Sequence, residues 1–281
     1  MTVCVLGRVI NLRFRRFLKD FWQIFIFGSI SRSLKNRMFS DCFFDKITIK
    51  EADKMVIYKT NFTPDHWFKF PNDFSERNFL WKKIGPFCFP VGLAYYGLCG
   101  GIAAAALDFF YNQLNPPTRT SPPSSKEDKP LFNWLKKRQV DTISLRNLWK
   151  YLKFMFTSKK TDQQEIVQAW DQIKQELRAG NPVLIGLERV KVDAWYKIHH
   201  LTRIVQNHQV VVWSAQQKTS EVQLNLYDPS RPQVHDARIR LNLLKNTIEC
   251  YTPDLGPIYT FFKTNYRPSP HPNLLNIDPL E

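Results

Sequence analysis

The chain has 281 residues, 43% of them hydrophobic and 14% aromatic, which is enough to bury a large core and argues against an intrinsically disordered protein. Its net charge of +15 comes from basic residues that are spread along the chain without a nucleic-acid-binding motif, so we expect no specific nucleic acid partner. Five scattered cysteines lack a Cys-x-x-Cys pair, which argues against a disulfide framework and a structural zinc site and favours a cytoplasmic setting.

Residues 1–40 are predicted to form a basic N-terminal extension with helical character, followed by one folded domain over residues 41–281. The apolar run Phe21–Phe27 is too short to span a bilayer, and the residues after it make a poor signal-peptide cleavage site. Two interpretations stay open. The extension either packs on the domain as a helix or lies on a membrane surface as a basic amphipathic helix, which would give a cytoplasmic protein with peripheral membrane contact.

The first part of the domain is predicted to contain a strand, an aromatic loop and a buried helix. Met55–Tyr58 has the apolar character of a strand, and His66–Phe74 is expected to be an ordered loop whose aromatic side chains anchor in the core. Residues 84–107 carry no charge, but prolines and glycines interrupt their first part. We therefore expect a short buried helix from Cys99 rather than a transmembrane helix. The Pro/Ser-rich residues 115–129 are expected to form a surface loop.

The rest of the chain is predicted to change from helices to strands. Helical spacing predicts helices over 131–138, over 144–156 and from Thr161 onward, the last opened by a capping box with Gln164 and ended at Gly180. The runs expected to form strands are 183–187, 209–213, 222–227, 237–243 and 258–262. Helices followed by an antiparallel sheet indicate the α+β class.

Three residues in this order carry the chemistry that a thiol site requires. Cys99 opens the small-residue helix, and the N-terminus of a helix stabilises a thiolate. His208 leads into an apolar strand, from which an imidazole can take the thiol proton. Asp228 ends the next strand, where a carboxylate can orient that imidazole. We predict Cys99 as nucleophile, His208 as base and Asp228 as the orienting group, with no metal and no cofactor.

Each of these assignments has an alternative in the same sequence. Cys99 is otherwise a small core residue of an Ala/Gly-rich helix, His208 a histidine satisfied at a strand end, and Asp228 a turn residue before Pro229. Asp108 is expected to be structural, because it lies more than two helical turns after the cysteine. The competing residues are His199, His200 and His235 for the base and Asn207 for the orienting group. A metal site built from the histidines is not expected, because their spacing fits no ligand pattern.

The segments Leu98–Gly101, Asn207–Val210 and Tyr227–Pro229 resemble the papain-like superfamily of cysteine peptidases. The chain is similar to the bacterial branch that contains the leader-processing peptidases of bacteriocin exporters, and more similar still to a family of uncharacterised bacterial papain-like proteins. The resemblance extends from residue 60 to residue 265, and its supporting stretches are 66–74, 105–110, 130–135 and 138–139. It implies a papain-like α+β fold, in which a central helix carrying the cysteine packs on an antiparallel sheet carrying the histidine and the aspartate.

One departure from the family concerns the oxyanion. Papain-like peptidases usually carry a glutamine shortly before the cysteine, and here Leu93 stands in its place. The backbone N–H of Cys99 would supply one donor, and Tyr95, Tyr96 or Asn72 a second one. The resemblance implies a thiol-dependent hydrolase or acyl transferase acting on a peptide or protein substrate. The alternative is a catalytically inactive papain-like scaffold that binds a peptide or protein partner; the substrate and the oligomeric state stay open.

Overall fold

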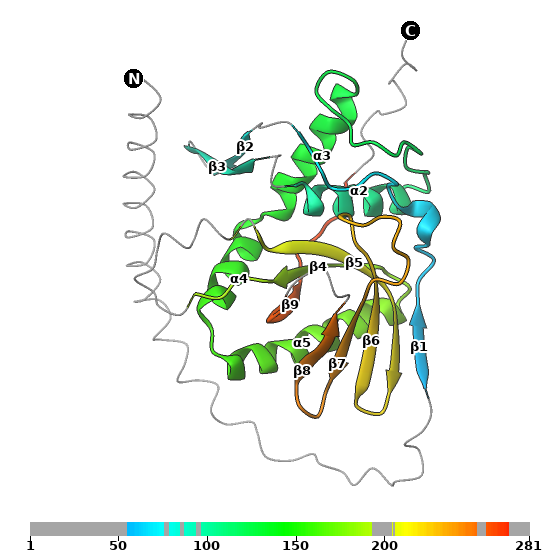
Figure 1. Cartoon of the computed structure of the whole chain (residues 1–281), viewed down its shortest axis with the longest axis vertical. Coiled ribbons are helices and arrows are strands. Elements are labelled where there is room, and N and C mark those ends of the chain that lie inside the picture. The colour runs from blue at the N-terminus through cyan, green and yellow to red at the C-terminus, as the bar shows by residue number, and fades with distance from the viewer. Residues whose placement is uncertain are drawn as a thin grey trace. The chain divides into compact units, whose positions relative to one another are not determined.

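A computed structural model describes residues 55–75, 79–84, 87–93, 97–192, 204, 206–251 and 257–269. The chain divides into two units, Met1–Glu51 and Ala52–Glu281, and the N-terminal extension expected from the sequence lies outside the described residues. The described part combines helices with an antiparallel sheet, so the predicted α+β class is confirmed (Figure 1). None of its helices has the length and apolarity needed to cross a bilayer.

Seven antiparallel strands form the main sheet. Six of them follow one another in the order β8 (Thr247–Tyr251), β7 (Arg238–Asn242), β6 (Glu221–Tyr227), β5 (His208–Lys218), β4 (Val183–Glu188) and β9 (Thr260–Lys263). The seventh, β1 (Val56–Lys59), pairs with the second half of β5, and β4 pairs with the first half. Both therefore line one edge of β5, and β6 lines the other edge. This long central strand carries His208 at its first residue.

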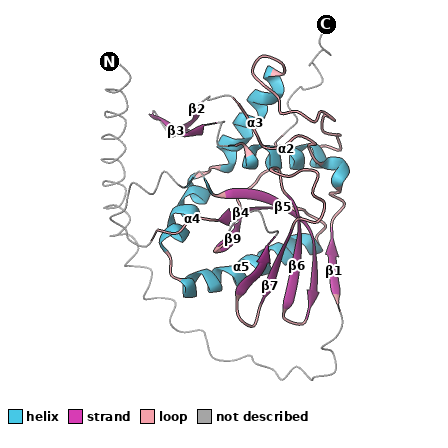
Figure 2. Ribbon diagram, in the orientation of Figure 1, coloured by secondary structure: helices cyan, strands magenta, loops and turns pink. Residues whose placement is uncertain are grey.

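Helices cover both faces of the sheet (Figure 2). On one face, α2 (Cys99–Tyr111) and α3 (Lys129–Thr142) share a core with Val211 of β5. On the other face, α5 (Lys159–Arg178) shares a second core with Val210. Adjacent residues of β5 enter different cores because successive side chains of a strand point to opposite faces. The uncharged sequence around Cys99 is thus that of a buried helix.

Several boundaries differ from those that the sequence predicts: α3 covers Lys129–Thr142 instead of 131–138, β9 covers Thr260–Lys263 instead of 258–262, and two further differences have a clear local cause. Ser158, not Thr161, caps α5, because its side chain accepts a hydrogen bond from the N–H of Thr161 and the helix already begins at Lys159. The polar run 216–220 predicts a five-residue turn, but β5 continues through Lys218. The turn is only two residues long, with Thr219 in the left-handed region at φ 51°.

A two-stranded hairpin, β2 (Phe79–Ile84) with β3 (Phe87–Leu93), and strand β8 of the main sheet are not predicted from the sequence. Prolines favour loops, and Pro90 lies inside β3. The structure accommodates it opposite an irregularity in β2, where the register shifts and no proline N–H is needed.

The aromatic segment before α2 anchors in the core, as predicted. It begins with a single turn of 3₁₀ helix, η2 (Pro64–His66), and continues as an ordered loop. Trp67 is buried and stacks on Tyr227, the last residue of β6, with ring centres 5.0 Å apart. Further buried aromatic residues of this segment are Phe68, Phe70 and Phe74. The loop therefore runs across the end of β6, directly beside Asp228.

Helix α4 (Leu145–Phe156) follows α3 in the chain and packs its aromatic face on β9. Its Tyr151 ring meets the Phe262 ring edge to face, with centres 4.7 Å apart. Gly186 of β4 makes room for this pair, because an added Cβ would lie 2.4 Å from the Tyr151 hydroxyl. Helix α4 is thereby fixed close to the start of β5.

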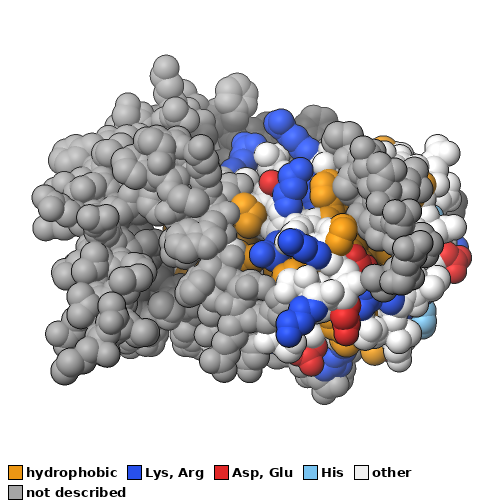
Figure 3. Space-filling model, turned by 90° about the horizontal axis from the view of Figure 1, so that it is seen from above, with side chains coloured by type: hydrophobic (Ala, Val, Ile, Leu, Met, Phe, Trp, Pro, Cys, Tyr) orange, Lys and Arg blue, Asp and Glu red, His pale blue; other side chains and the backbone are white. Residues whose placement is uncertain are grey.

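Basic side chains gather, with hydrophobic ones between them, on the face shown in Figure 3. On α3, the ammonium of Lys136 lies 5.2 Å from the centre of the Phe132 ring, and that of Lys137 lies 5.0 Å from the Trp134 ring. Such contacts stabilise a cation within the domain. Part of the positive charge thus has a structural use, and the absence of a specific nucleic acid partner stays a prediction.

Candidate functional site

Cys99 is the first residue of α2 and has 9% of its surface exposed. The two glycines that follow it let neighbouring elements approach closely. A Cβ on Gly101 would lie 2.3 Å from the carbonyl oxygen of Leu135 on α3, and a Cβ on Gly100 would lie 2.7 Å from the side-chain amide of Gln209 on β5. The Cys-Gly-Gly sequence therefore brings α3 and β5 against the thiol end of the helix.

The first turn of α2 has one backbone donor left over. The N–H before Cys99 donates to Oδ1 of Asn72 at 2.5 Å, and the N–H of Gly101 donates to Oε1 of Gln139 at 2.7 Å. The N–H of Gly100 approaches the thiol itself. The N–H of Cys99 has no partner among the described residues. It is thus the group at this helix end that can bind a developing negative charge.

The structure brings the three predicted site residues together. Nε2 of His208 lies 2.8 Å from Oδ1 of Asp228, and both side chains are buried. The His208 ring lies close enough to the thiol of Cys99 for the two groups to shift each other's pKa. Because Nε2 is used by the carboxylate, Nδ1 is the nitrogen left for the thiol. Acid, imidazole and thiol therefore lie together in one buried group.

The electrostatics of this chain favour an ion pair. Burial would raise the pKa of the Cys99 thiol, but the charge and hydrogen bond of His208, with the N–H groups of Gln209 and Gly100, outweigh it and lower the pKa. Burial would lower the pKa of His208, but the charges of Asp228 and Cys99 raise it to about 10. A thiolate beside an imidazolium is therefore the expected state near neutral pH.

Asp228 is kept charged at the end of β6. Burial opposes its ionisation, but the charge and hydrogen bond of His208 and the N–H of Ser230, which donates to Oδ1 at 2.8 Å, lower its pKa. The N–H of Arg231 also donates to the carbonyl oxygen of Asp228 at 3.0 Å. The turn after β6 thus fixes both the position and the charge of the carboxylate.

Asn72 connects the two halves of the site. Its backbone N–H donates to the carbonyl oxygen of Pro229, next to Asp228, at 3.0 Å. Its side-chain Oδ1 accepts from the N–H of Leu98, at the start of α2. Gly97 lies directly beneath this amide with φ +97°, and a Cβ there would lie 2.4 Å from Nδ2 of Asn72. Asn72 therefore sets the spacing between the end of β6 that carries Asp228 and the start of α2 that carries Cys99.

Asn207, the alternative orienting residue, hydrogen-bonds away from the imidazole. Its Nδ2 donates to Oε2 of Glu188 at 3.1 Å, and its Oδ1 accepts from the N–H of Arg189 at 2.9 Å. The hydroxyl of Tyr151 donates to the carbonyl oxygen of His208 at 3.3 Å. Both contacts hold the backbone at the start of β5, so Asn207 and Tyr151 support the histidine without touching its ring nitrogens.

Glu188 is a fully buried acid that the sequence analysis missed, because a glutamate at the end of an apolar strand usually marks the strand's exposed end. Burial raises its pKa to about 8, against the hydrogen bonds from Asn207 and the N–H of Val190 that lower it. The residues before it are apolar and the residues after it are Arg189 and Val190, and neither pattern predicts that the Glu188 side chain is buried. The pairing of β4 with β9, which sets Glu188 opposite Thr260, joins segments that are far apart in the sequence.

The remaining candidates lie elsewhere. His235 is exposed and stacks on Trp67 with ring centres 5.4 Å apart. Asp108 accepts hydrogen bonds from Arg138, from the Tyr266 hydroxyl and from a backbone N–H near the C-terminal end of the described chain, which fits the structural role expected for it. The other candidates, His199, His200, Tyr95 and Tyr96, lie outside the described residues. Within the part of the chain that the structure describes, no group of three or more His, Cys, Asp or Glu could hold a metal ion.

The site thus consists of a thiol with a lowered pKa, an imidazole whose raised pKa favours its protonated form, a buried carboxylate, and a backbone N–H of Cys99 that has no partner among the described residues. These groups suit nucleophilic attack on a carbonyl carbon followed by proton transfer to the leaving group. Comparison with models of known protein families, with characterised proteins and with solved structures finds no match to this chain.

Proposed function

We propose that the protein is a papain-like, thiol-dependent hydrolase or acyl transferase that acts on an amide bond of a peptide or protein substrate. The observation that carries this proposal is the buried group of Cys99, His208 and Asp228, in which His208 lowers the pKa of the thiol and Nε2 of His208 lies 2.8 Å from Oδ1 of Asp228. Its order along the sequence, from helix start to strand start to strand end, supports the papain-like assignment. The reaction needs no metal and no cofactor.

In the proposed reaction, the thiolate of Cys99 attacks the carbonyl carbon, a C–S bond forms, and the carbonyl electrons move to the oxygen. The N–H of Cys99 stabilises that oxyanion. His208 donates its proton to the leaving nitrogen as the C–N bond breaks, and an acyl-thioester remains. Water or an acceptor amine then loses a proton to His208, attacks the thioester and releases the thiolate. Asp228 holds the imidazole in orientation and stabilises its charged form.

Asn72 is the proposed second donor to the oxyanion. Its Oδ1 is engaged by the backbone N–H before Cys99, which leaves its amide hydrogens as the donors at the same helix end. An amide brought from an upstream loop would replace the glutamine whose position is held by Leu93. Two donors at the oxyanion are what acyl-transfer sites generally use.

The first test measures the pH dependence of Cys99 alkylation by iodoacetamide, with the other four cysteines changed to serine. The expected result is a thiolate that reacts well below the free-thiol pKa of about 8.5, and that loses this reactivity in His208→Ala. A Cys99→Ala variant that stays folded identifies the labelled residue. Alkylation with an ordinary pH midpoint, unchanged by His208→Ala, would sink the proposal.

Two observations favour a second candidate function, a papain-like scaffold that binds a peptide or protein partner without turnover. Leu93 stands where the family usually has its glutamine, and Cys99 is largely buried. The two functions differ in turnover. A scaffold would show no release of nitrophenol from a p-nitrophenyl ester beyond that of its Cys99→Ala variant, whereas an enzyme would show a burst and continued release.

A further inference from the structure

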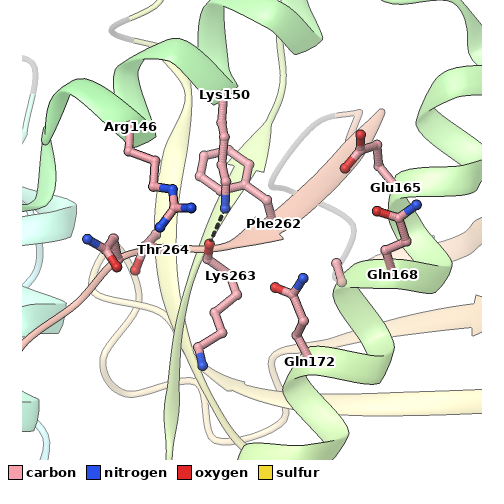
Figure 4. A pocket seen from close by; sticks show the side chains of 10 residues that line it. Arg146, Lys150, Glu165, Gln168, Gln172, Phe262, Lys263 and Thr264 are labelled. Atoms are coloured by element: carbon pink, nitrogen blue, oxygen red, sulfur yellow. Dashed lines mark hydrogen bonds between the residues drawn. The ribbon is translucent and has the colours of Figure 1, made fainter. Parts of the chain in front are cut away.

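A polar hollow of about 450 Å³ lies between α4, α5 and β9, and none of Cys99, His208 and Asp228 lines it. Figure 4 shows Arg146 and Lys150 extending into it from α4, and the side chains of α5 facing them across the gap. The α5 residues are Glu165, Gln168 and Gln172. The volume falls within the range of small-molecule sites, but the lining is polar and charged instead of apolar.

The acid in the lining is already neutralised. Glu165 pairs with Lys153 at 2.7 Å, and this lysine is on the same helix as Arg146. The ammonium of Lys263, on the floor strand, pairs with Glu176 beyond the hollow. Each of these ion pairs joins one positive and one negative side chain, so neither adds net charge to the hollow. The net charge of the hollow therefore depends on the other charged residues that line it.

Arg146 and Lys150 are those other members, and neither has a carboxylate partner among the described residues. The Lys150 ammonium donates instead to the carbonyl oxygen of Lys263 at 2.8 Å and lies 5.0 Å from the centre of the Phe262 ring. Burial and then the charge of Arg146 lower the pKa of Lys150, although Glu165 opposes them. An exposed guanidinium and a half-buried ammonium thus lie side by side, and the Glu165 carboxylate in the same lining is paired with Lys153.

We propose that this hollow binds a small molecule through a carboxylate or phosphate group held between Arg146 and Lys150. A guanidinium fork binds such oxyanions in a bidentate manner, and an ammonium adds a point charge. Gln168 and Gln172 lie four residues apart, on one face of α5, and bind the neutral polar groups of the same ligand. The hollow is too small for a folded partner. The proposal does not depend on the thiol chemistry.

The experiment is calorimetric titration of the full chain with inorganic phosphate and, separately, with succinate, at an ionic strength held constant with potassium chloride. The two probes separate a phosphate ligand from a carboxylate ligand. Arg146→Gln removes the exposed guanidinium, and Lys150→Met keeps the aliphatic stem over Phe262 while removing the charge. The matched control is Arg240→Gln, which removes a positive charge from an exposed position on β7.

The expected result is saturable binding of at least one probe at one site, weakened about tenfold or more by Arg146→Gln and by Lys150→Met and unchanged by Arg240→Gln. Heat that does not saturate for either probe would overturn the proposal, as would an equal weakening in all three variants, because general charge attraction would then explain the binding. If Lys150→Met fails to fold, Arg146→Gln still tests the proposal, because the Arg146 side chain is exposed and its replacement should leave the fold intact.

Discussion

Nε2 of His208 lies 2.8 Å from Oδ1 of Asp228, and these two side chains are 5% and 1% exposed. A charge in such a place interacts strongly with its neighbours because little water screens it. The carboxylate therefore controls the ionisation of the imidazole and, through it, of the thiol.

Replacing Asp228 with Asn should raise the pKa of the Cys99 thiol, since the imidazolium that stabilises the thiolate loses its counter-charge. We expect the rate of alkylation at pH 6 to fall about tenfold or more, with the whole pH profile displaced upward. The control is Asp236→Asn, which removes an exposed acid from the loop after β6. A profile that stays in place in Asp228→Asn would show that the carboxylate does not govern the thiol.

Asn72 gives a prediction that separates thiolate formation from oxyanion binding. Alkylation by iodoacetamide needs the thiolate but no oxyanion, whereas ester hydrolysis needs both. If the Asn72 amide binds the oxyanion, Asn72→Ala should keep most of the alkylation rate and lose about 100- to 1,000-fold in ester hydrolysis. Asn112→Ala, which removes an amide at the opposite end of α2, serves as the control.

The contradicting outcome for Asn72 is an equal loss in both reactions. That result would mean that the residue acts only by holding the backbone N–H before Cys99, through the 2.5 Å hydrogen bond to its Oδ1. The proposed donor to the oxyanion would then have to be another group.

The raised pKa of Glu188 leads to a prediction about how the free energy of unfolding depends on pH. Burial raises its pKa from the ordinary value of about 4.5 to about 8 in the folded protein, so the folded state holds more protons between these pH values. The free energy of unfolding should therefore fall as the pH rises from about 4.5 to about 8, by an amount on the order of a few kcal/mol. Urea unfolding across this range measures the slope, which Glu188→Gln should reduce. An identical slope in both proteins would assign it to other groups.

Alanine substitutions at Gly101 and Gly100 test how closely neighbouring elements pack against α2. Alanine normally stabilises a helix interior by about 1 kcal/mol relative to glycine. At Gly101, the added Cβ would lie 2.3 Å from the backbone oxygen of Leu135, so we expect Gly101→Ala to destabilise the fold by about 1–3 kcal/mol. At Gly100 the neighbours are side-chain atoms of Thr142 and Gln209, which can move. In urea unfolding, Gly100→Ala should have a higher free energy of unfolding than Gly101→Ala. The reverse order would contradict this account of the contact between α2 and α3.

The contact among Cys99, His208 and Asp228 could be predicted because local sequence marks each residue's place. Glycines and alanines identify a buried helix after the cysteine, an apolar run follows the histidine, and an Asp-Pro pair ends an alternating strand. These signals depend on neighbours in the chain, so they are visible without the structure. The catalytic roles of the three residues stay a prediction.

Other parts of the site depend on segments far apart in the chain. Asn72 binds the residues beside both Asp228 and Cys99, and no local pattern around it indicates either partner. Glu188 lies opposite Thr260 of β9, the last strand, which pairs with β4 from far along the chain. The start of α5 was misplaced for a different reason. Ser158 and Thr161 are both residue types that cap helices well, so the sequence alone does not show which of them is the N-cap. In the structure the Ser158 side chain accepts a hydrogen bond from the N–H of Thr161, which makes Ser158 the cap.

His208 and Gln209, which contribute most to lowering the pKa of Cys99, come more than a hundred residues later in the chain. While the protein is being synthesised, the cysteine leaves the ribosome long before His208 exists to activate it. The nascent or unfolded chain therefore carries an ordinary thiol, mostly protonated in a neutral cell. We therefore expect Cys99 to react at mildly acidic pH only in native molecules, so a labelling reagent used there would count correctly folded protein.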